Sequence, residues 1–133
     1  MTKKLYVTRP LPDKVIAAAK ELGHVDVRQS TLPITPAEIR AALENYDGGL
    51  ASIGDPLGAE AFAGPGRCKM LANFGVGYNH IDGAAARAAG IAVANTPGAV
   101  TDATADIAVM LILMAARGAS KSERVLRAGQ WEG

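Results

Sequence analysis

The residues most suited to chemistry form one short glycine-containing stretch, NFGVGYNHID, which spans Asn73 to Asp82. Gly75 and Gly77 allow a ligand to approach the backbone closely and permit dihedral angles at which successive N–H groups converge. Asp82 is placed to begin a helix, and a helix N-terminus adds partial positive charge. The spacing indicates a site for a carboxylate or a phosphate. A plain tight turn has the same glycine pattern, and this stretch alone does not separate the two.

The same stretch does not fit the fingerprint that binds dinucleotides. That fingerprint, G-x-G-x-x-G, needs a third glycine where the helix packs closely on its strand. After Gly75 and Gly77 this position is His80, and a second segment, GPGRCK at 64–69, fails as well. The sequence also has no P-loop. We therefore expect this chain alone to bind no nicotinamide cofactor.

No side chains have the spacing of a catalytic or a metal site. We expect His24 and His80 to be solvated residues of a loop or a helix edge. Cys68 has no paired base in view and is expected to be a small buried or half-exposed residue. Arg9 and Arg117 have the charge to bind an anionic substrate, but surface and helix-end roles are favoured.

The composition indicates one domain with a sizeable core. The chain has 133 residues, 49% of them hydrophobic, a net charge of +1 and one cysteine. The scattered charges exclude a basic patch for nucleic acid or a membrane surface. The N-terminus lacks the apolar core of a signal peptide, and the longest apolar run, Ile107 to Ala116, is too short to span a bilayer. We expect a cytoplasmic protein with no nucleic-acid or membrane partner.

Strand-like and helix-like segments alternate along the chain. Short apolar runs end at turn residues, and stretches of helical spacing are bounded by capping residues and glycine. The clearest helix start has Thr35 as N-cap, Pro36 at the first helical position and Glu38 closing a capping box. The expected strands are 5–7, 25–27, 49–53, 70–74 and 91–95, and the expected helices are 12–22, one from residue 36, a weak one at 58–63, 82–89, 101–117 and 120–128.

This alternation with short connections favours an α/β fold, in which helices cover both faces of a parallel sheet. Five units in this length fit a flavodoxin-like three-layer fold with a five-stranded parallel sheet in the order 2-1-3-4-5. Such sheets bind ligands beyond the carboxyl ends of their strands. Three loops lie there: SIGDP at 52–56, GVGYN at 75–79 and NTPGAVT at 95–101.

Two other functions of this fold are disfavoured by the loop after the first strand. A phospho-receiver needs acidic residues there, and a flavin mononucleotide site needs a loop rich in hydroxyl groups and glycine. The chain has Thr8-Arg9-Pro10 at this place.

The segment from Asn73 to Arg117 carries a family resemblance. Its sequence, NFGVGYNHIDGAAARAAGIAVANTPGAVTDATADIAVMLILMAAR, resembles the D-isomer-specific 2-hydroxyacid dehydrogenases, most closely the glyoxylate/hydroxypyruvate reductase branch. That family has a Gly-x-Gly loop before an Ile-Asp helix start, an alanine-rich helix, a Gly-Ile strand and an Asn-Thr-Pro turn. A helix beginning Thr-x-x-x-Ala-Glu follows, and Asp106 stands at its acidic position in this chain. The ending RVLRAGQWEG resembles the segment that leads into the family's cofactor domain.

The resemblance implies a substrate site in a flavodoxin-like domain of residues 1–100. In the family, backbone groups at the positions of Val76 and Gly77 contact the carboxylate of a 2-oxo acid, and the first of these positions also borders the nicotinamide. The position of Thr104 touches the dinucleotide, and Trp131 lies where the family has inter-subunit tryptophans. The implied substrate-binding residues are Ser52, Ile53, Gly54, Gly75, Val76 and Gly77, and the implied cofactor-binding residues are Val76 and Thr104.

The resemblance also implies that part of the enzyme lies outside this sequence. The family's cofactor domain, with its G-x-G-x-x-G and its catalytic arginine, glutamate and histidine, follows the point where these 133 residues stop. We therefore expect the isolated substrate-binding domain of an NAD(P)-dependent oxidoreductase that reduces a small 2-oxo acid, with no catalytic residue and no activity of its own. The alternative is a stand-alone flavodoxin-like binding or interaction module without catalysis.

Residues 101–133 are expected to form interdomain or dimerisation helices. Apolar residues fill the run from Ile107 to Met114, so this helix is apolar nearly all round and must be buried on more than one side. Either it folds back on its own sheet, or it pairs with a second chain and gives a homodimer through 101–128. We favour the dimer, because burial all round needs more surface than one sheet face offers.

Overall fold

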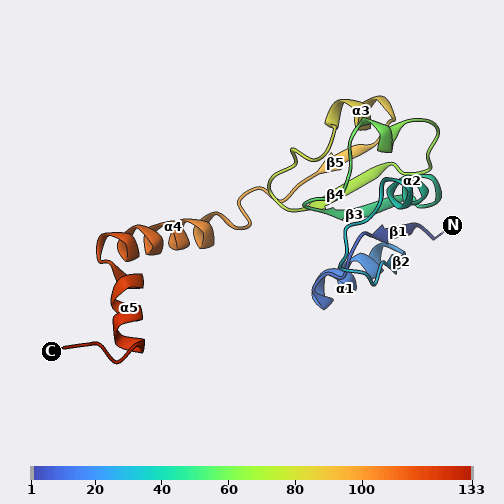
Figure 1. The fold of residues 1–133 in the computed structure, drawn as a ribbon. Coiled ribbons are helices and arrows are strands. Elements are labelled where there is room, and N and C mark those ends of the chain that lie inside the picture. Colours follow the sequence, from blue (N-terminus) through green and yellow to red (C-terminus); the bar gives the residue numbers. More distant parts are fainter. Residues whose placement is uncertain (1, 133) are drawn as a thin grey trace. The chain divides into compact units, whose positions relative to one another are not determined.

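The computed structural model describes residues 2–132 of the chain (Figure 1). They divide into two compact units, one up to Pro97 and one from Gly98 onward. The first unit contains every strand of the described chain, and the second contains two helices.

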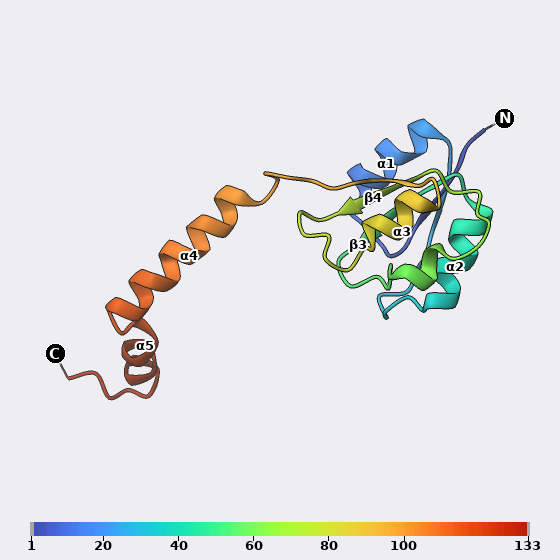
Figure 2. The same ribbon diagram turned by 90° about the horizontal axis from the view of Figure 1, so that it is seen from above.

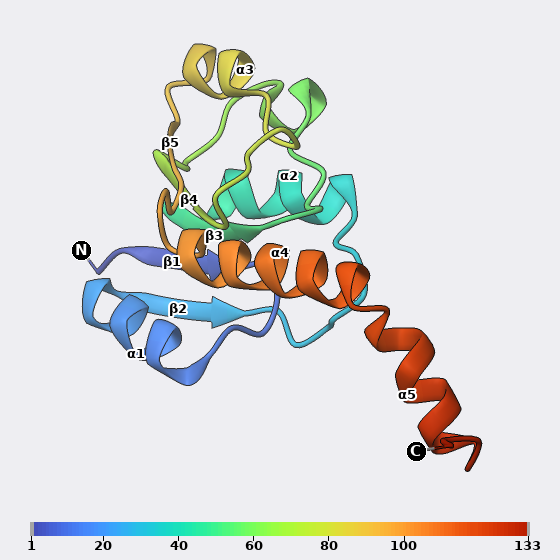
Figure 3. The same ribbon diagram turned by 90° about the vertical axis from the view of Figure 1, so that its left-hand side faces the viewer.

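The first unit is built on a five-stranded parallel sheet with the strand order β2-β1-β3-β4-β5 (Figure 3). This arrangement confirms the predicted fold class and strand order. Every connection between strands passes through a helix or a 3-10 turn, as parallel pairing requires. The strands are β1 (Lys4–Val7), β2 (His24–Val27), β3 (Gly48–Ser52), β4 (Met70–Phe74) and β5 (Ala92–Ala94).

Helices cover both faces of this sheet (Figure 2). One face carries α1 (Asp13–Leu22), and the other carries α2 (Pro36–Asn45), the 3-10 helix η1 (Ala59–Phe62) and α3 (Gly83–Ala88). The main core lies between the sheet and these last three elements. Its buried side chains include Ile39, Leu43, Ala51, Phe62, Leu71 and Ala86.

The beginning of α2 confirms the predicted capping box. Thr35 Oγ1 accepts a hydrogen bond from Glu38 N–H at 3.2 Å, and Glu38 Oε2 accepts one from Thr35 N–H at 2.8 Å. Pro36 occupies the first helical turn, where its missing N–H costs nothing. With its start fixed in this way, α2 turns Ile39 and Leu43 into the core.

The last strand is shorter than the predicted range 91–95. The N–H of Ile91 donates to the carbonyl of Ala86 at 2.9 Å, near the end of α3, so it is not available to the sheet. Pairing with β4 is therefore confined to Ala92–Ala94.

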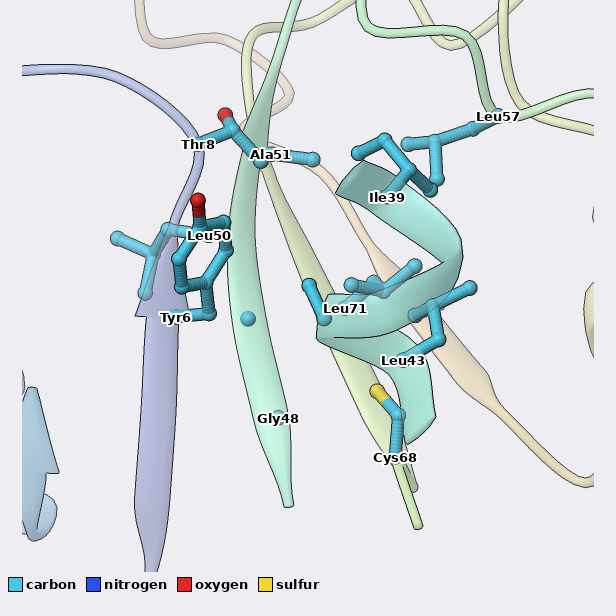
Figure 4. Close-up of a pocket in the computed structure, with 12 residues that line it drawn as sticks. Tyr6, Thr8, Ile39, Leu43, Gly48, Leu50, Ala51, Leu57, Cys68 and Leu71 are labelled. Atoms are coloured by element: carbon cyan, nitrogen blue, oxygen red, sulfur yellow. The ribbon is translucent and has the colours of Figure 1, made fainter. Parts of the chain in front are cut away.

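The packing of α2 on the sheet leaves a small internal cavity of about 20 Å³ (Figure 4). Its lining is largely apolar and includes Tyr6, Leu43 and Leu71. A space of this size has room for about one water molecule. It is a gap in the core packing rather than a ligand site.

Strand β4 alternates strictly between the two faces of the sheet. Leu71 and Asn73 are buried on the face under α2, η1 and α3, whereas Met70 and Phe74 are 51% and 43% exposed on the other. The alternation places the side chain of Asn73 on the core face, one residue before the carboxyl end of the strand.

The second unit consists of α4 (Thr101–Ala116) and α5 (Ala119–Arg127). The chain turns between them at Gly118, whose φ of 61° lies in the left-handed region that glycine favours. Within this unit α5 buries no residue of α4. No single helix among residues 2–132 has the length and apolarity to cross a bilayer, although α4 and α5 meet that criterion jointly as a pair bent by 67°.

Candidate functional site

The loops predicted to bind a ligand begin side by side at one edge of the sheet. Ser52 at the end of β3 pairs with Phe74 at the end of β4, and Ala72 of β4 pairs with Ala94 of β5. The third predicted loop, 95–101, passes from the first unit into the second after Pro97. The first unit therefore brings together the residues after β3, the Gly75–Gly77 loop and the start of the third loop.

All three carbonyl groups of the Gly75–Gly77 loop are held by hydrogen bonds. Asn73 Nδ2 donates to Gly75 O at 3.1 Å and to Gly77 O at 2.9 Å. Asn95 Nδ2 donates to Val76 O at 2.8 Å, and the N–H of the residue after Asn95 donates to Gly75 O at 3.2 Å. These bonds fix the loop against the ends of β4 and β5.

The N–H groups of the same loop remain open. Val76 N–H and Gly77 N–H donate no hydrogen bond to any of residues 2–132. A Cβ built on Gly77 would meet nothing within 4 Å, so the space beside this residue is open as well. Two adjacent backbone donors without partners, beside a residue with open space, can hold an anionic group such as a carboxylate.

Gly75 is required by a close approach and not by its dihedral angles. The dihedral freedom expected of Gly75 and Gly77 is not used in the left-handed region, since neither has a positive φ. A Cβ built on Gly75 would lie 3.0 Å from Ile53 Cγ1 and 3.4 Å from Asn73 Nδ2. The predicted residue Ile53 therefore packs directly against the predicted loop.

Sequence reasoning missed Asn73, the group that holds this loop. The residue is 1% exposed, and its Oδ1 atom is buried with no hydrogen-bond partner among residues 2–132. A buried acceptor without a partner costs about 1–3 kcal/mol. The signal available in the sequence was a polar residue at an inward position of an otherwise apolar strand.

A buried carboxylate shapes the neighbouring loop after β3. Asp55 is 1% exposed, and its Oδ2 atom accepts from Thr8 Oγ1 at 2.7 Å and from Ser52 N–H at 2.8 Å. Its Oδ1 atom accepts from Arg9 Nη2 at 3.3 Å. Arg9 is thus anchored to the protein and only one-third exposed, with a side-chain exposure of 34%. Asp55 was not among the predicted site residues.

The predicted residues Ser52, Ile53 and Gly54 differ in exposure and in backbone conformation. Ser52 is buried, and its hydroxyl oxygen has no hydrogen-bond partner among the described residues, while its N–H is used by Asp55. Ile53 is 64% exposed. Gly54 has a φ of 92°, a conformation that favours glycine, and turns the chain toward Asp55. Ile53 is therefore the group of this loop that faces outward.

The histidines and the cysteine do not form a catalytic cluster within residues 2–132. His24 is exposed and hydrogen-bonded to Asp26 through Nε2 and Oδ1 at 3.1 Å, as expected of a solvated residue. His80 differs from the expectation, because it is partly buried and its Nε2 atom is buried without a partner in the described chain. Cys68 is buried, its Sγ donates to Met70 O at 3.4 Å, and burial raises the pKa of its thiol.

The predicted cofactor-binding residue Thr104 lies outside the first unit. Thr104 lies in the first turn of α4, in the second unit, where its N–H donates to Val100 O at 2.9 Å. Its predicted contact with a dinucleotide stays a prediction. Residues 2–132 hold no group of three or more His, Cys, Asp or Glu side chains that could bind a metal ion.

A wider, open hollow of about 650 Å³ lies beside α3 and β5. Tyr78, Arg87 and Asn95 contribute its polar groups, and Ile91 and Val93 contribute apolar surface. Asn95 is also the residue that holds the Val76 carbonyl. The loop is therefore accessible from the side of this hollow.

Comparison with known proteins gives a consistent family assignment. Residues 5–130 match the family model described as "D-isomer specific 2-hydroxyacid dehydrogenase, catalytic domain". Among curated proteins, a glyoxylate reductase from Korarchaeum cryptofilum is 32% identical over 132 residues, which are 99% of this chain and 40% of the relative. The chain thus spans about 40% of the length of that relative.

Solved structures of similar fold support the same assignment. A protein from Polaromonas sp., described as an NAD-binding D-isomer specific 2-hydroxyacid dehydrogenase, has a TM-score of 0.83 and 31% identity, covering 100% of this chain and 42% of its own. An NADPH-dependent glyoxylate/hydroxypyruvate reductase from Sinorhizobium meliloti, in complex with NADP and malonate, has a TM-score of 0.77 and 29% identity, covering 98% of this chain and 40% of its own.

Proposed function

The chain belongs to the D-isomer specific 2-hydroxyacid dehydrogenase family, and we propose that it supplies the substrate-binding domain of an NAD(P)-dependent oxidoreductase that reduces a small 2-oxo acid such as glyoxylate or hydroxypyruvate. The observation that carries this proposal is the pair of open N–H groups at Val76 and Gly77 in a loop whose carbonyls are all held. A carboxylate is the charged group common to all 2-oxo acids.

The acid is held by backbone groups and bounded by an apolar wall. Its carboxylate accepts hydrogen bonds from Val76 N–H and Gly77 N–H, and the rest of the molecule extends into the open space beside Gly77. The exposed side chain of Ile53, which packs against Gly75, bounds this space. The loop Ser52–Gly54 therefore limits the size of the acid rather than supplying a polar contact, since the Ser52 hydroxyl is buried.

The residues of this chain fit the edge of a nicotinamide site and not a whole one. Gly75 and Gly77 have no third glycine at position 80, where His80 is partly buried, so the loop lacks the close helix–strand packing of a dinucleotide fingerprint. We propose that Val76 borders the nicotinamide and that Thr104 touches the dinucleotide, while further protein holds the cofactor. A bound nicotinamide supplies the hydride.

We also propose that α4 and α5 form a homodimer contact through residues 101–128. The apolar side chains of α4 find no cover within the second unit. An interface between two copies of the same helix would cover them symmetrically. A chain with one cysteine can form no internal disulfide, which fits a reducing compartment, and we propose a cytoplasmic location.

An activity assay on two lengths of chain tests this function. The 133 residues alone, mixed with glyoxylate or hydroxypyruvate and NADPH or NADH, should not change the absorbance of the reduced cofactor, because neither a held nicotinamide nor an acid/base group is encoded in them. The product of the complete reading frame should contain a G-x-G-x-x-G segment and oxidise the cofactor only when the acid is present.

Two outcomes would count against the proposal. Turnover by the 133 residues alone at an ordinary enzymatic rate would contradict the assignment as a substrate-binding part. A complete reading frame that adds no dinucleotide fingerprint would favour the stand-alone binding module instead.

A further inference from the structure

We propose that Asn73 is a positioning residue for the acid: its side-chain amide sets the direction of the Val76 and Tyr78 N–H groups at the Gly75–Gly77 loop. This inference rests on the proposed function in one respect, namely that an anion binds at that loop. It concerns a residue that touches only the loop and not the acid.

The side-chain amide nitrogen of Asn73 donates two hydrogen bonds to the loop. Asn73 Nδ2 carries two hydrogens, and it donates to Gly75 O at 3.1 Å and Gly77 O at 2.9 Å. One short side chain thereby fixes two peptide groups that are separated by a single residue. Serine, threonine or an ionised aspartate at this position has at most one donor.

The directions of the N–H groups follow from peptide geometry. The described chain has no cis peptide bonds, so the C=O and the following N–H of each peptide group point in opposite directions. Because Gly75 O points toward Asn73, Val76 N–H points away from it. Because Gly77 O also points toward Asn73, the N–H of Tyr78 points away as well, and this N–H too donates no hydrogen bond to residues 2–132.

Asn95 holds the remaining carbonyl of the loop. It holds the Val76 carbonyl at 2.8 Å, so the same geometry directs Gly77 N–H away from Asn95. Asn73 therefore fixes the direction of Val76 N–H and Tyr78 N–H, and Asn95 fixes the direction of Gly77 N–H. The loop is thus arranged before any ligand arrives.

Its two carbonyl partners make the orientation of the Asn73 amide unambiguous. A rotated amide would bring Oδ1 against two carbonyl oxygens, neither of which can donate a hydrogen bond. The hydrogen bonds of its side chain stay within five residues of chain, so the sheet does not depend on them. Removal of the amide is therefore expected to loosen the loop and leave the strands in place.

The test compares Asn73→Asp with a matched change, Asn45→Asp. Asn45 also donates through Nδ2 to a backbone carbonyl, that of Ala41 at 2.8 Å, but on the exposed side of α2. Near neutral pH, Asn73→Asp should speed hydrogen exchange of the Val76 and Tyr78 amides in the absence of ligand. It should also weaken the affinity for glyoxylate, measured from the NMR shifts of these amides, by about tenfold, a change of about 1.4 kcal/mol. Asn45→Asp should change neither.

Lowering the pH adds a rescue that a merely destabilised protein would not show. A protonated carboxyl group has one O–H donor, so Asn73→Asp should regain part of its glyoxylate response as the pH falls, while the unmodified chain should not improve. Asn73→Leu, similar in size and without donors, should lose the response at every pH. If the buried carboxylate of Asn73→Asp prevents folding, Asn73→Leu replaces it in the test.

The unmodified chain supplies a check that needs no variant. Both Nδ2 protons of Asn73 should exchange with solvent far more slowly than those of Asn45. Free exchange of the Asn73 amide, or a folded Asn73→Leu that binds glyoxylate as the unmodified chain does, overturns the proposal. If glyoxylate moves no loop amide even in the unmodified chain, the proposed function fails, while the exchange rates still decide the role of Asn73.

Discussion

The two units of this chain differ in where their polar and apolar side chains lie. In the first unit, polar groups such as Asn73 and Asp55 are buried and hydrogen-bonded to nearby loops, and a core of buried apolar side chains packs against one face of the sheet. In the second unit, the apolar side chains are on the outside: Ile112 and Leu113 of α4 are 66% and 60% exposed.

This contrast separates what each unit can do alone. The side chains that hold the carbonyls of the Gly75–Gly77 loop, Asn73 and Asn95, both belong to the first unit. The second unit has an apolar helix that, by itself, does not bury its surface, and such a helix is stable only against another surface. We therefore propose a ligand-binding role for the first unit and an association role for the second.

The largest effect is expected from a charge on α4. We predict that the chain is a dimer at micromolar concentration and that Ile112→Glu makes it a monomer. A buried isoleucine contributes about 1.5–3 kcal/mol and occurs twice in a two-fold interface, so the loss is about 3–6 kcal/mol. Analytical ultracentrifugation measures the change.

Ala18→Glu, which adds the same charge at an exposed position of α1 in the first unit, is the control and should leave the dimer intact. A monomeric unmodified chain would show that α4 does not pair with a copy of itself. The exposed apolar side chains of α4 would then need a different partner to cover them.

A smaller effect is expected inside the first unit, from two glycine substitutions. A Cβ at Gly75 would meet Ile53 Cγ1 at 3.0 Å, so the exposed Ile53 side chain must shift and Gly75→Ala should lower the free energy of unfolding by about 1 kcal/mol. At Gly77 nothing lies within 4 Å, so Gly77→Ala should change it by less than about 0.5 kcal/mol while weakening glyoxylate binding. Urea unfolding gives both values.

Shortening the opposing side chain sharpens this test. In an Ile53→Ala background, Gly75→Ala should cost clearly less than in the unmodified chain, because the clash has been removed. Equal costs in the two backgrounds would mean that Ile53 does not set the need for glycine.

The sequence predicted the fold and pointed to the Gly75–Gly77 loop, but it did not indicate which side chains hold that loop. Alternating strands and helices, with a capping box at Thr35, are local signals, and they led to the correct strand order. The Gly75–Gly77 loop was also visible locally. Its support was not, because Asp55 meets Thr8 across 47 residues and the role of Asn73 depends on which face of β4 it occupies.

The reason for the glycine at position 75 was equally hidden. Its dihedral angles are ordinary, and the need for glycine comes from Ile53, a contact between two loops that only the folded sheet brings together. Contacts between loops from different strands leave no periodic pattern in a sequence. They can be inferred only once the strand order and register are known.

The smallest effect is expected at the opposite edge of the sheet. Hydrogen bonds from Arg67, together with one from Lys4 N–H, lower the pKa of Asp47 from 3.8 to about 2. A carboxylate whose pKa is lowered on folding stabilises the fold above its unfolded pKa, and this contribution is lost as the pH falls through its folded value. The affected range therefore lies between about pH 4 and pH 2.

Arg67→Gln should raise the pKa of Asp47 toward its ordinary value, as an NMR titration of the carboxyl group would show. Lys69→Gln removes the same charge nearby without removing a side-chain hydrogen bond to Asp47, so it should shift this pKa far less. Neither change should alter the glyoxylate response of the loop, which is formed at the other end of the strands.

The central claim is that the first unit holds the carboxylate of a small acid on the N–H groups of Val76 and Gly77. An NMR titration of the ¹⁵N-labelled 133-residue chain tests it most directly, with glyoxylate as the ligand and glycolaldehyde, which has the same carbon skeleton and no carboxylate, as the control. We predict that the Val76 and Gly77 amide signals shift and saturate with glyoxylate in the millimolar range and stay in place with glycolaldehyde. Shifts confined to other residues, or equal shifts with both compounds, would contradict it.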